Sequence, residues 1–133
     1  MRHSPDWPRK RVVVMVNPAE IRCRRERLGL TAEGLAQVLG IDERNVRRWE
    51  QGTQGISERS VELLNQLEDR YAALVDDLSA GNRDPVVTFA TDDELWAAHP
   101  ELRPLPARVH RVAAAETVIR HGGGIAYHAD RTG

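Results

Sequence analysis

The sequence contains one cysteine, few aromatic residues and a single lysine, and it has no long apolar run. Cys23, standing alone, excludes an internal disulfide and any zinc site built from several cysteines. No apolar run exceeds Val12–Val16 in length, and such a run cannot cross a bilayer, so we expect no membrane association. No basic start leads into a long apolar stretch with a small-residue cleavage site. We therefore expect a cytoplasmic protein.

The charge of the 133-residue chain is distributed unevenly along the sequence. The formal net charge is −1, a total that by itself argues against a nucleic-acid partner. Residues 1–60, however, hold 12 Arg or Lys against 8 Asp or Glu, whereas residues 61–133 hold 7 against 12. Every cation except Lys10 is an arginine, which suits bidentate contacts with phosphate and guanine. The first half is therefore the part that fits a nucleic-acid partner.

The composition, with 41% hydrophobic and 29% charged residues, is typical of a soluble globular domain or of a small domain with an appendage. Residues 1–16 form a basic extension with two prolines and no helical period. Met15 directly precedes the first helix signal and could itself be the start of the protein. Alternatively, Val12–Val16 form a short strand or pack on the body of the domain.

The first predicted helix runs from Pro18 to about Leu28. Asn17 is its N-cap, and Glu20 stands where a capping box requires an acidic residue. The spacing places Arg25 on the inner, apolar face of this helix. A charge in that position needs a buried partner or must extend to water.

Two short helices follow and are joined by a tight turn. Thr31 caps a helix over 32–39 that ends at Gly40, and Asp42 caps a helix over 43–51. The residues that face inward are Leu35, Ala36, Leu39, Val46 and Trp49. This arrangement is a helix-turn-helix, in which the outer face of the second helix can enter the major groove of DNA.

The fourth predicted helix is long, beginning after Ser57 and ending near Gly81. Its apolar stripe consists of Leu64, Leu67, Tyr71, Leu74 and Leu78. The stripe could be a dimer seam, or its two halves could pack on the rest of the same chain. Two heptads are too few to define a coiled coil, so we favour packing within the chain.

Beyond this helix the sequence predicts a mixture of strands and helices. Strands are expected over 86–90 and 125–128, and a helix over 107–121. A short helix capped by Asp92 or Asp93 precedes the longer one.

Residues 28–42, LGLTAEGLAQVLGID, and residues 46–52, VRRWEQG, resemble the λ-repressor-like family of Cro, repressor and xenobiotic-response-element regulators. The resemblance covers residues 18–65. It implies a mainly α fold, with a helix-turn-helix domain of four to five helices over 17–80. A small α/β dimerisation region would then occupy residues 84–133.

The resemblance also assigns roles to individual residues. The residues that would read base edges are Glu43, Arg44, Asn45, Arg47 and Arg48. Thr31 and Thr53 match positions that hold the DNA backbone, and Arg25 and Glu50 match a structural ion pair. Ala32 stands where relatives often have a glutamine that clamps the backbone, so this chain departs from the pattern there. Gly34 is a second departure, because glycine inside a helix costs about 1 kcal/mol relative to alanine.

Residues 93–111, together with the first half, resemble anti-CRISPR-associated autorepressors, in which a dimerisation domain follows the helix-turn-helix. The resemblance implies a homodimeric phage or bacterial transcription regulator, an (auto)repressor that binds a double-stranded DNA operator with an inverted repeat, at the nucleoid. One alternative is an antitoxin that neutralises a toxin and also represses its own operon. A further alternative is RNA binding through the same basic face.

No catalytic, cofactor or metal site is expected. The histidines His99, His110, His121 and His128 lack metal-binding spacings and are interpreted as surface or capping residues. Phe89 and Trp96 are interpreted as core or interface residues, and no phosphate-binding glycine loop precedes a helix. We therefore expect a protein that is not an enzyme.

Overall fold

The structure is a computed structural model, and it describes residues 16–129. Of the predicted extension over 1–16, only Val16 is among the described residues. Met15 and the rest of the alternative strand over Val12–Val16 lie outside them. The chain divides into two compact units, residues 1–67 and 68–133. The division falls within a long helix, whereas the sequence sets the border between the two predicted domains at the end of that helix. That border remains a prediction.

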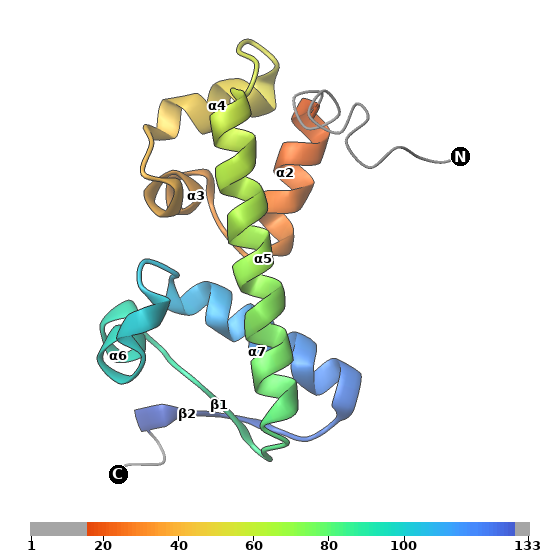
Figure 1. Cartoon of the computed structure of the whole chain (residues 1–133), viewed down its shortest axis with the longest axis vertical. Helices are drawn as coiled ribbons and strands as arrows, with labels where there is room; N and C mark the ends of the chain where they lie inside the picture. The colour runs from red at the N-terminus through yellow and green to blue at the C-terminus, as the bar shows by residue number, and fades with distance from the viewer. Residues whose placement is uncertain (1–15, 130–133) are drawn as a thin grey trace. The chain divides into compact units, whose positions relative to one another are not determined.

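The first unit is helical (Figure 1). It contains α2 (Pro18–Arg27), α3 (Ala32–Leu39), α4 (Glu43–Gln51) and the first ten residues of α5 (Glu58–Ala80). These helices agree with the sequence predictions because the local signals are strong. Asn17 and Glu20 form the expected capping box on α2, and Thr31 and Asp42 cap the next two helices.

The core of the first unit is built from the apolar faces of these helices. Its fully buried side chains include Ile21, Leu28, Leu35, Val46, Val61 and Leu64. Trp49 is also buried, and within the described residues its indole Nε1 is the only fully enclosed side-chain polar atom without a hydrogen-bond partner. Packing of this kind holds the short helices in place, since helices of eight to ten residues are marginal alone.

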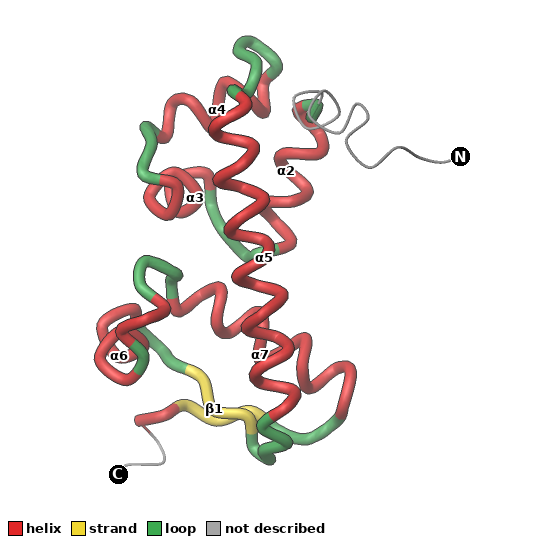
Figure 2. The backbone as a smooth tube through the Cα atoms, viewed as in Figure 1, coloured by secondary structure: helices red, strands yellow, loops and turns green. Residues whose placement is uncertain are grey.

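The second unit combines helices with a small parallel sheet (Figure 2). After the remainder of α5 come β1 (Val86–Thr88), α6 (Asp92–Ala98), the 3₁₀ helix η1 (Pro100–Leu102), α7 (Ala107–His121) and β2 (Ile125–Tyr127). The two strands pair in parallel, and the connection between them contains α6, η1 and α7. A mainly helical fold that includes a small α/β region is thus confirmed.

The apolar stripe of α5 is largely buried within the single chain. Leu64, Leu67, Tyr71 and Leu74 are buried, and Leu78 is half-buried. In the second unit the Tyr71 hydroxyl donates a hydrogen bond to Glu116. These residues therefore serve packing inside the chain, as favoured from the sequence, rather than a seam between two chains.

The start of α6 differs from the prediction. Thr91, not Asp92 or Asp93, is the N-cap, and it forms a capping box with Glu94. The carboxylate of Asp92 instead accepts a hydrogen bond from the backbone N–H of Ala107 at 2.7 Å. Asp92 thereby satisfies the first turn of α7, whose N-cap is a proline without a side-chain acceptor.

Both strands are shorter than predicted. The strand predicted over 86–90 ends at Thr88, because the carbonyls of Phe89 and Ala90 accept hydrogen bonds from Arg111 Nη1 at 2.9 Å each. The second strand ends at Tyr127 instead of His128. The arginine on α7 takes up carbonyl groups that a longer strand would have to satisfy by pairing.

His110 corrects the expectation that the histidines lie on the surface or at caps. Its side chain lies on α7 and is only 2% exposed. Its Nδ1 is 2.7 Å from the Thr88 hydroxyl on β1, so it joins the helix to the strand. Burial, with a smaller effect from nearby His99, lowers the pKa of His110 to about 4.

We expect His110 to reduce the free energy of unfolding by about 2 kcal/mol between about pH 7.5 and about pH 5. The unfolded chain takes up a proton near the ordinary pKa of 6.5, whereas the folded chain resists it until about pH 4. Stability is therefore complete above the unfolded pKa and is lost as the pH falls toward the folded pKa. Urea unfolding at the two pH values measures the loss. A His110→Gln variant should lose most of this pH dependence, and an unchanged dependence in the variant would contradict the prediction.

Candidate nucleic-acid interface

The turn between α3 and α4 has a backbone that only a few residues tolerate. Gly40 ends α3 in the left-handed conformation with φ 72°, and the N–H of Ile41 then donates to the Ala36 carbonyl at 3.0 Å. Asp42 starts α4 by accepting from the N–H of Arg44 at 2.8 Å. Since Val46 and Trp49 are buried, α4 is held by one face and presents the opposite face to solvent.

The exposed face of α4 carries three arginines and a glutamine. With about 3.6 residues per turn, the residues opposite Val46 and Trp49 are Arg44, Arg47, Arg48 and Gln51, and all four are exposed. Glu43 and Asn45 are half-buried and flank this face. Of the residues predicted to read bases, the structure therefore brings the three arginines together and places the other two at the edges.

Gln51 is the residue that the sequence analysis did not include. It lies one turn beyond Arg47 and Arg48, so the helical spacing alone could have found it. A glutamine side chain can bond bidentately to adenine, which makes Gln51 chemically suited to this face. Asn45 accepts a hydrogen bond from Gln54 Nε2 at 3.2 Å, so its amide is already partly engaged.

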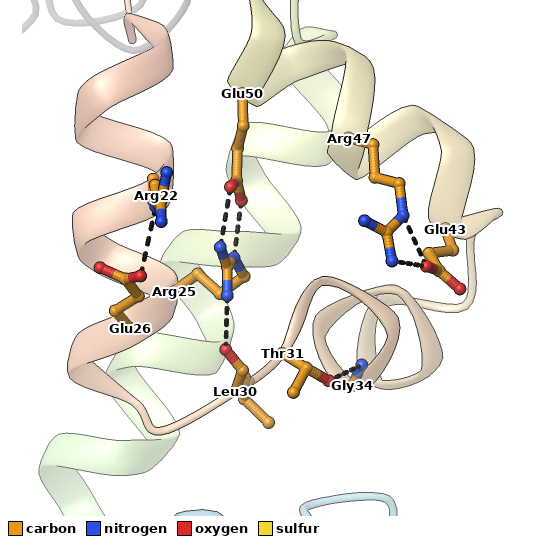
Figure 3. A network of polar contacts seen from close by, with 9 residues as sticks. All are labelled: Arg22, Arg25, Glu26, Leu30, Thr31, Gly34, Glu43, Arg47 and Glu50. Atoms are coloured by element: carbon orange, nitrogen blue, oxygen red, sulfur yellow. Dashed lines mark hydrogen bonds and ion pairs between the residues drawn. The ribbon is translucent and has the colours of Figure 1, made fainter.

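The three arginines differ in how their charges are compensated. Arg44 pairs with Asp42 at 2.9 Å, and hydrogen bonds from Arg44 lower the pKa of that carboxyl group to about 2. Arg47 pairs with Glu43 on the preceding turn of α4, with Nε 2.6 Å from the carboxylate (Figure 3). Arg48 forms no direct ion pair among the described residues, although its charge helps Arg44 to lower the pKa of Asp42. Arg48 can therefore approach an anion or a base without first leaving a carboxylate.

The start of α3 explains why glycine occupies position 34. The N–H of Gly34 donates to the Thr31 hydroxyl at 2.9 Å, which is the cap of the helix (Figure 3). A Cβ on Gly34 would lie 3.2 Å from that oxygen, closer than ordinary contact. Thr31 itself is exposed, as is Thr53, whose hydroxyl donates to the Arg48 carbonyl at 3.4 Å. Ala32, by contrast, offers no polar side chain at the clamp position.

Arg25 and Glu50 form a bidentate ion pair between α2 and the end of α4 (Figure 3). Arg25 Nε and Nη2 donate to the two carboxylate oxygens at 2.7 and 2.8 Å. Arg25 Nη1 also donates to the carbonyl of Leu30, at 2.9 Å, in the segment before α3. The two side chains are only 12% and 13% exposed, so one guanidinium connects three segments of the first unit.

Comparison with known proteins agrees with this geometry. Residues 19–78 match the family model described as a helix-turn-helix domain. A search of curated proteins gives no significant match to the chain. Within residues 16–129, no helix combines the length and the apolar character needed to cross a membrane. Residues 19–78 are therefore similar to helix-turn-helix domains, which agrees with the turn observed between α3 and α4.

Proposed function

We propose that the protein is a sequence-specific transcription regulator, of the Cro/repressor type, that binds its own operator as a homodimeric repressor. The observation that carries the proposal is the exposed face of α4, on which three arginines gather while Val46 and Trp49 anchor the opposite face. A helix held in this way can lie in the major groove with its side chains against base edges.

The contacts follow from the chemistry of each side chain. Arg48 bonds to guanine O6 and N7, whereas Arg44 and Arg47 exchange their carboxylate partners for the DNA. Glu43 at the edge can accept from the cytosine amino group, and Asn45 can bond to a base or a phosphate once it leaves Gln54. Thr31 and Thr53, at the start of α3 and after α4, hold the DNA backbone.

The dimer is proposed to form through the second unit. A single domain of this size contacts a short half-site, so two copies reading an inverted repeat supply the affinity and the specificity of an operator. The second unit is acidic, which keeps it away from DNA, and it exposes three large apolar side chains, Ile119, Ile125 and Tyr127. The protein would act in the cytoplasm, at the nucleoid.

Selection of bound sites from random duplex DNA, followed by footprinting, tests this function. We expect an inverted repeat whose half-site centres lie about 10–10.5 base pairs apart, and light scattering should give the mass of two chains. The same repeat should stand upstream of the gene for this protein, where a reporter should show repression. A single unpaired half-site bound by a monomer would contradict the proposal.

The fold of the second unit is the reason to favour a repressor over an antitoxin. Antitoxins often wrap their toxin with a tail that is disordered alone, whereas α6 and α7 here are capped and pack on a buried core. Co-purification with an unrelated small protein would favour the antitoxin instead. Competition of operator binding by the protein's own transcript would favour RNA as a second ligand.

Replacing Thr31 with alanine should weaken DNA binding about equally for every sequence, because a backbone contact carries no base information. The loss of the α3 cap should also lower the free energy of unfolding by about 1 kcal/mol. Thr91→Ala is the matched control, since it removes the equivalent cap from α6 in the second unit. Fluorescence anisotropy should show unchanged DNA affinity for the control. A loss confined to one DNA sequence in the Thr31 variant would contradict the backbone role.

A further inference from the structure

The second unit contains a cavity of about 810 Å³. Its walls come from the end of α5, from β1 and the residues next to it, from α6 with η1, from α7 and from the segment after β2. This volume lies within the range of pockets that enclose small organic ligands, about 300–1,000 Å³. The cavity lies wholly outside the helix-turn-helix motif, and DNA binding as proposed above does not use it.

An aromatic cluster forms one wall of the cavity. The ring of Phe89 is surrounded by three imidazoles, with ring centroids 5.2 Å away for His110, 5.3 Å for His128 and 5.6 Å for His99. Leucines from α5 and η1 line the cavity as well. Such walls favour a planar ring, which gains both apolar burial and edge-to-face contacts.

His110 supplies a polar atom that is free to bind a ligand. Its Nδ1 is engaged with Thr88, but Nε2 has no hydrogen-bond partner among the described residues. Within the described residues, Trp49 Nε1 is the only fully enclosed side-chain polar atom that lacks a partner. Nε2 of His110 is therefore not fully enclosed. His110 is one of the residues that line the cavity. A ligand group at this position would supply the missing hydrogen bond.

The polar residues of the cavity indicate which class of ligand it would bind. Besides its histidines, the cavity is lined by three acids, Asp77, Asp84 and Glu101, and by Arg83. Glu101 lies 3.4 Å from His99, and the Asp84 carboxylate accepts from the N–H of Gly124 at 2.9 Å. No group of three or more metal-binding side chains lies together within the described residues. His110 is neutral near pH 7, because burial holds its pKa at about 4, so a neutral hydroxyl or carbonyl group suits it.

We infer that the cavity binds a small aromatic molecule that carries a hydroxyl or carbonyl group. The ring lies against the exposed imidazoles of His99 and His128, which pack on Phe89, and the polar group hydrogen-bonds to Nε2 of His110. The inference does not depend on DNA binding, and it can be tested in the absence of DNA.

The test uses the full chain and three probes, with binding followed by NMR signals of the His110 and Phe89 side chains. 4-Hydroxyacetophenone has both the ring and the polar groups, toluene has the ring alone, and cyclohexanol has a hydroxyl without an aromatic ring. We expect saturable binding of 4-hydroxyacetophenone with a dissociation constant on the order of 1 mM or lower, and at least about tenfold weaker binding of the other two. Equal binding of all three, or no saturation, would overturn the inference.

Variants locate the site. Leu78→Trp places a large side chain in the cavity and should abolish binding, whereas Ala73→Trp, an exposed position on the same helix that does not line the cavity, should leave it unchanged. His110→Phe should remove the preference for 4-hydroxyacetophenone while toluene still binds, which shows that the cavity remains folded. Equal binding to the Leu78 variant and the wild type, or a retained preference in His110→Phe, would overturn the assignment.

Discussion

Replacing Arg25 with alanine is expected to lower the free energy of unfolding by about 3 kcal/mol, the cost of leaving a buried charge without its partner. The substitution strands the carboxylate of Glu50, whose side chain is 13% exposed, and also removes the hydrogen bond to the Leu30 carbonyl. The three segments that Arg25 joins lose their common connection. Urea unfolding near neutral pH measures the effect.

The surface pair Arg22–Glu26 provides the control. It also lies on α2, but its side chains are 64% and 53% exposed, so Arg22→Ala should cost no more than about 1 kcal/mol. A double variant with methionine at positions 25 and 50 should recover much of the stability, because no unpaired charge stays buried. Equal losses for Arg22→Ala and Arg25→Ala would contradict a special role for the buried pair.

Replacing Arg48 with alanine should weaken binding to the selected operator by about 1–3 kcal/mol, roughly 5- to 150-fold. Arg48 forms no direct ion pair among the described residues, so it can contact a guanine without first breaking one. Binding to unrelated DNA should change little beyond the loss of one charge. Fluorescence anisotropy on the operator and on a scrambled duplex at fixed salt measures both quantities.

Arg44→Ala and Arg47→Ala serve as matched comparisons on the same face of α4. Each of these arginines must leave an acidic partner, Asp42 or Glu43, before it contacts DNA. Each should therefore add less to the free energy of DNA binding, and its substitution should lower the affinity less. We therefore expect Arg48→Ala to cause the largest loss of operator affinity of the three substitutions. Equal losses on operator and scrambled DNA for Arg48→Ala would make it a phosphate contact, and a larger loss for Arg44 would contradict the argument from pairing.

Much of the first unit was predictable because its signals are local. Asn17, Thr31 and Asp42 each cap the helix that follows, and Gly40 ends α3 in a backbone that suits glycine. Such effects depend on neighbours within four residues, so the sequence carries them directly. The family resemblance then pointed to α4 and to the pair of Arg25 with Glu50, which the structure forms.

The second unit was less predictable because its decisive contacts join distant residues. Asp92 caps α7 from 15 residues away, and Arg111 binds the carbonyls that limit β1. His110 is spaced like the other histidines, yet it is buried because Thr88 and Phe89 meet it from another element. Nothing in the local sequence distinguishes these residues from exposed ones.

The net charge of −1 describes neither half of the chain, because basic residues are in excess in residues 1–60 and acidic residues in residues 61–133. By itself the sequence determined the starts of α2, α3 and α4, the helix-turn-helix and the arginines that suit it, because caps, glycines and helical period act over a few residues. Only the tertiary structure decided that His110 is buried against Thr88, that Asp92 caps α7, and that three histidines surround Phe89. These features depend on which side chains meet after folding, and pairing and burial are properties of that arrangement in space.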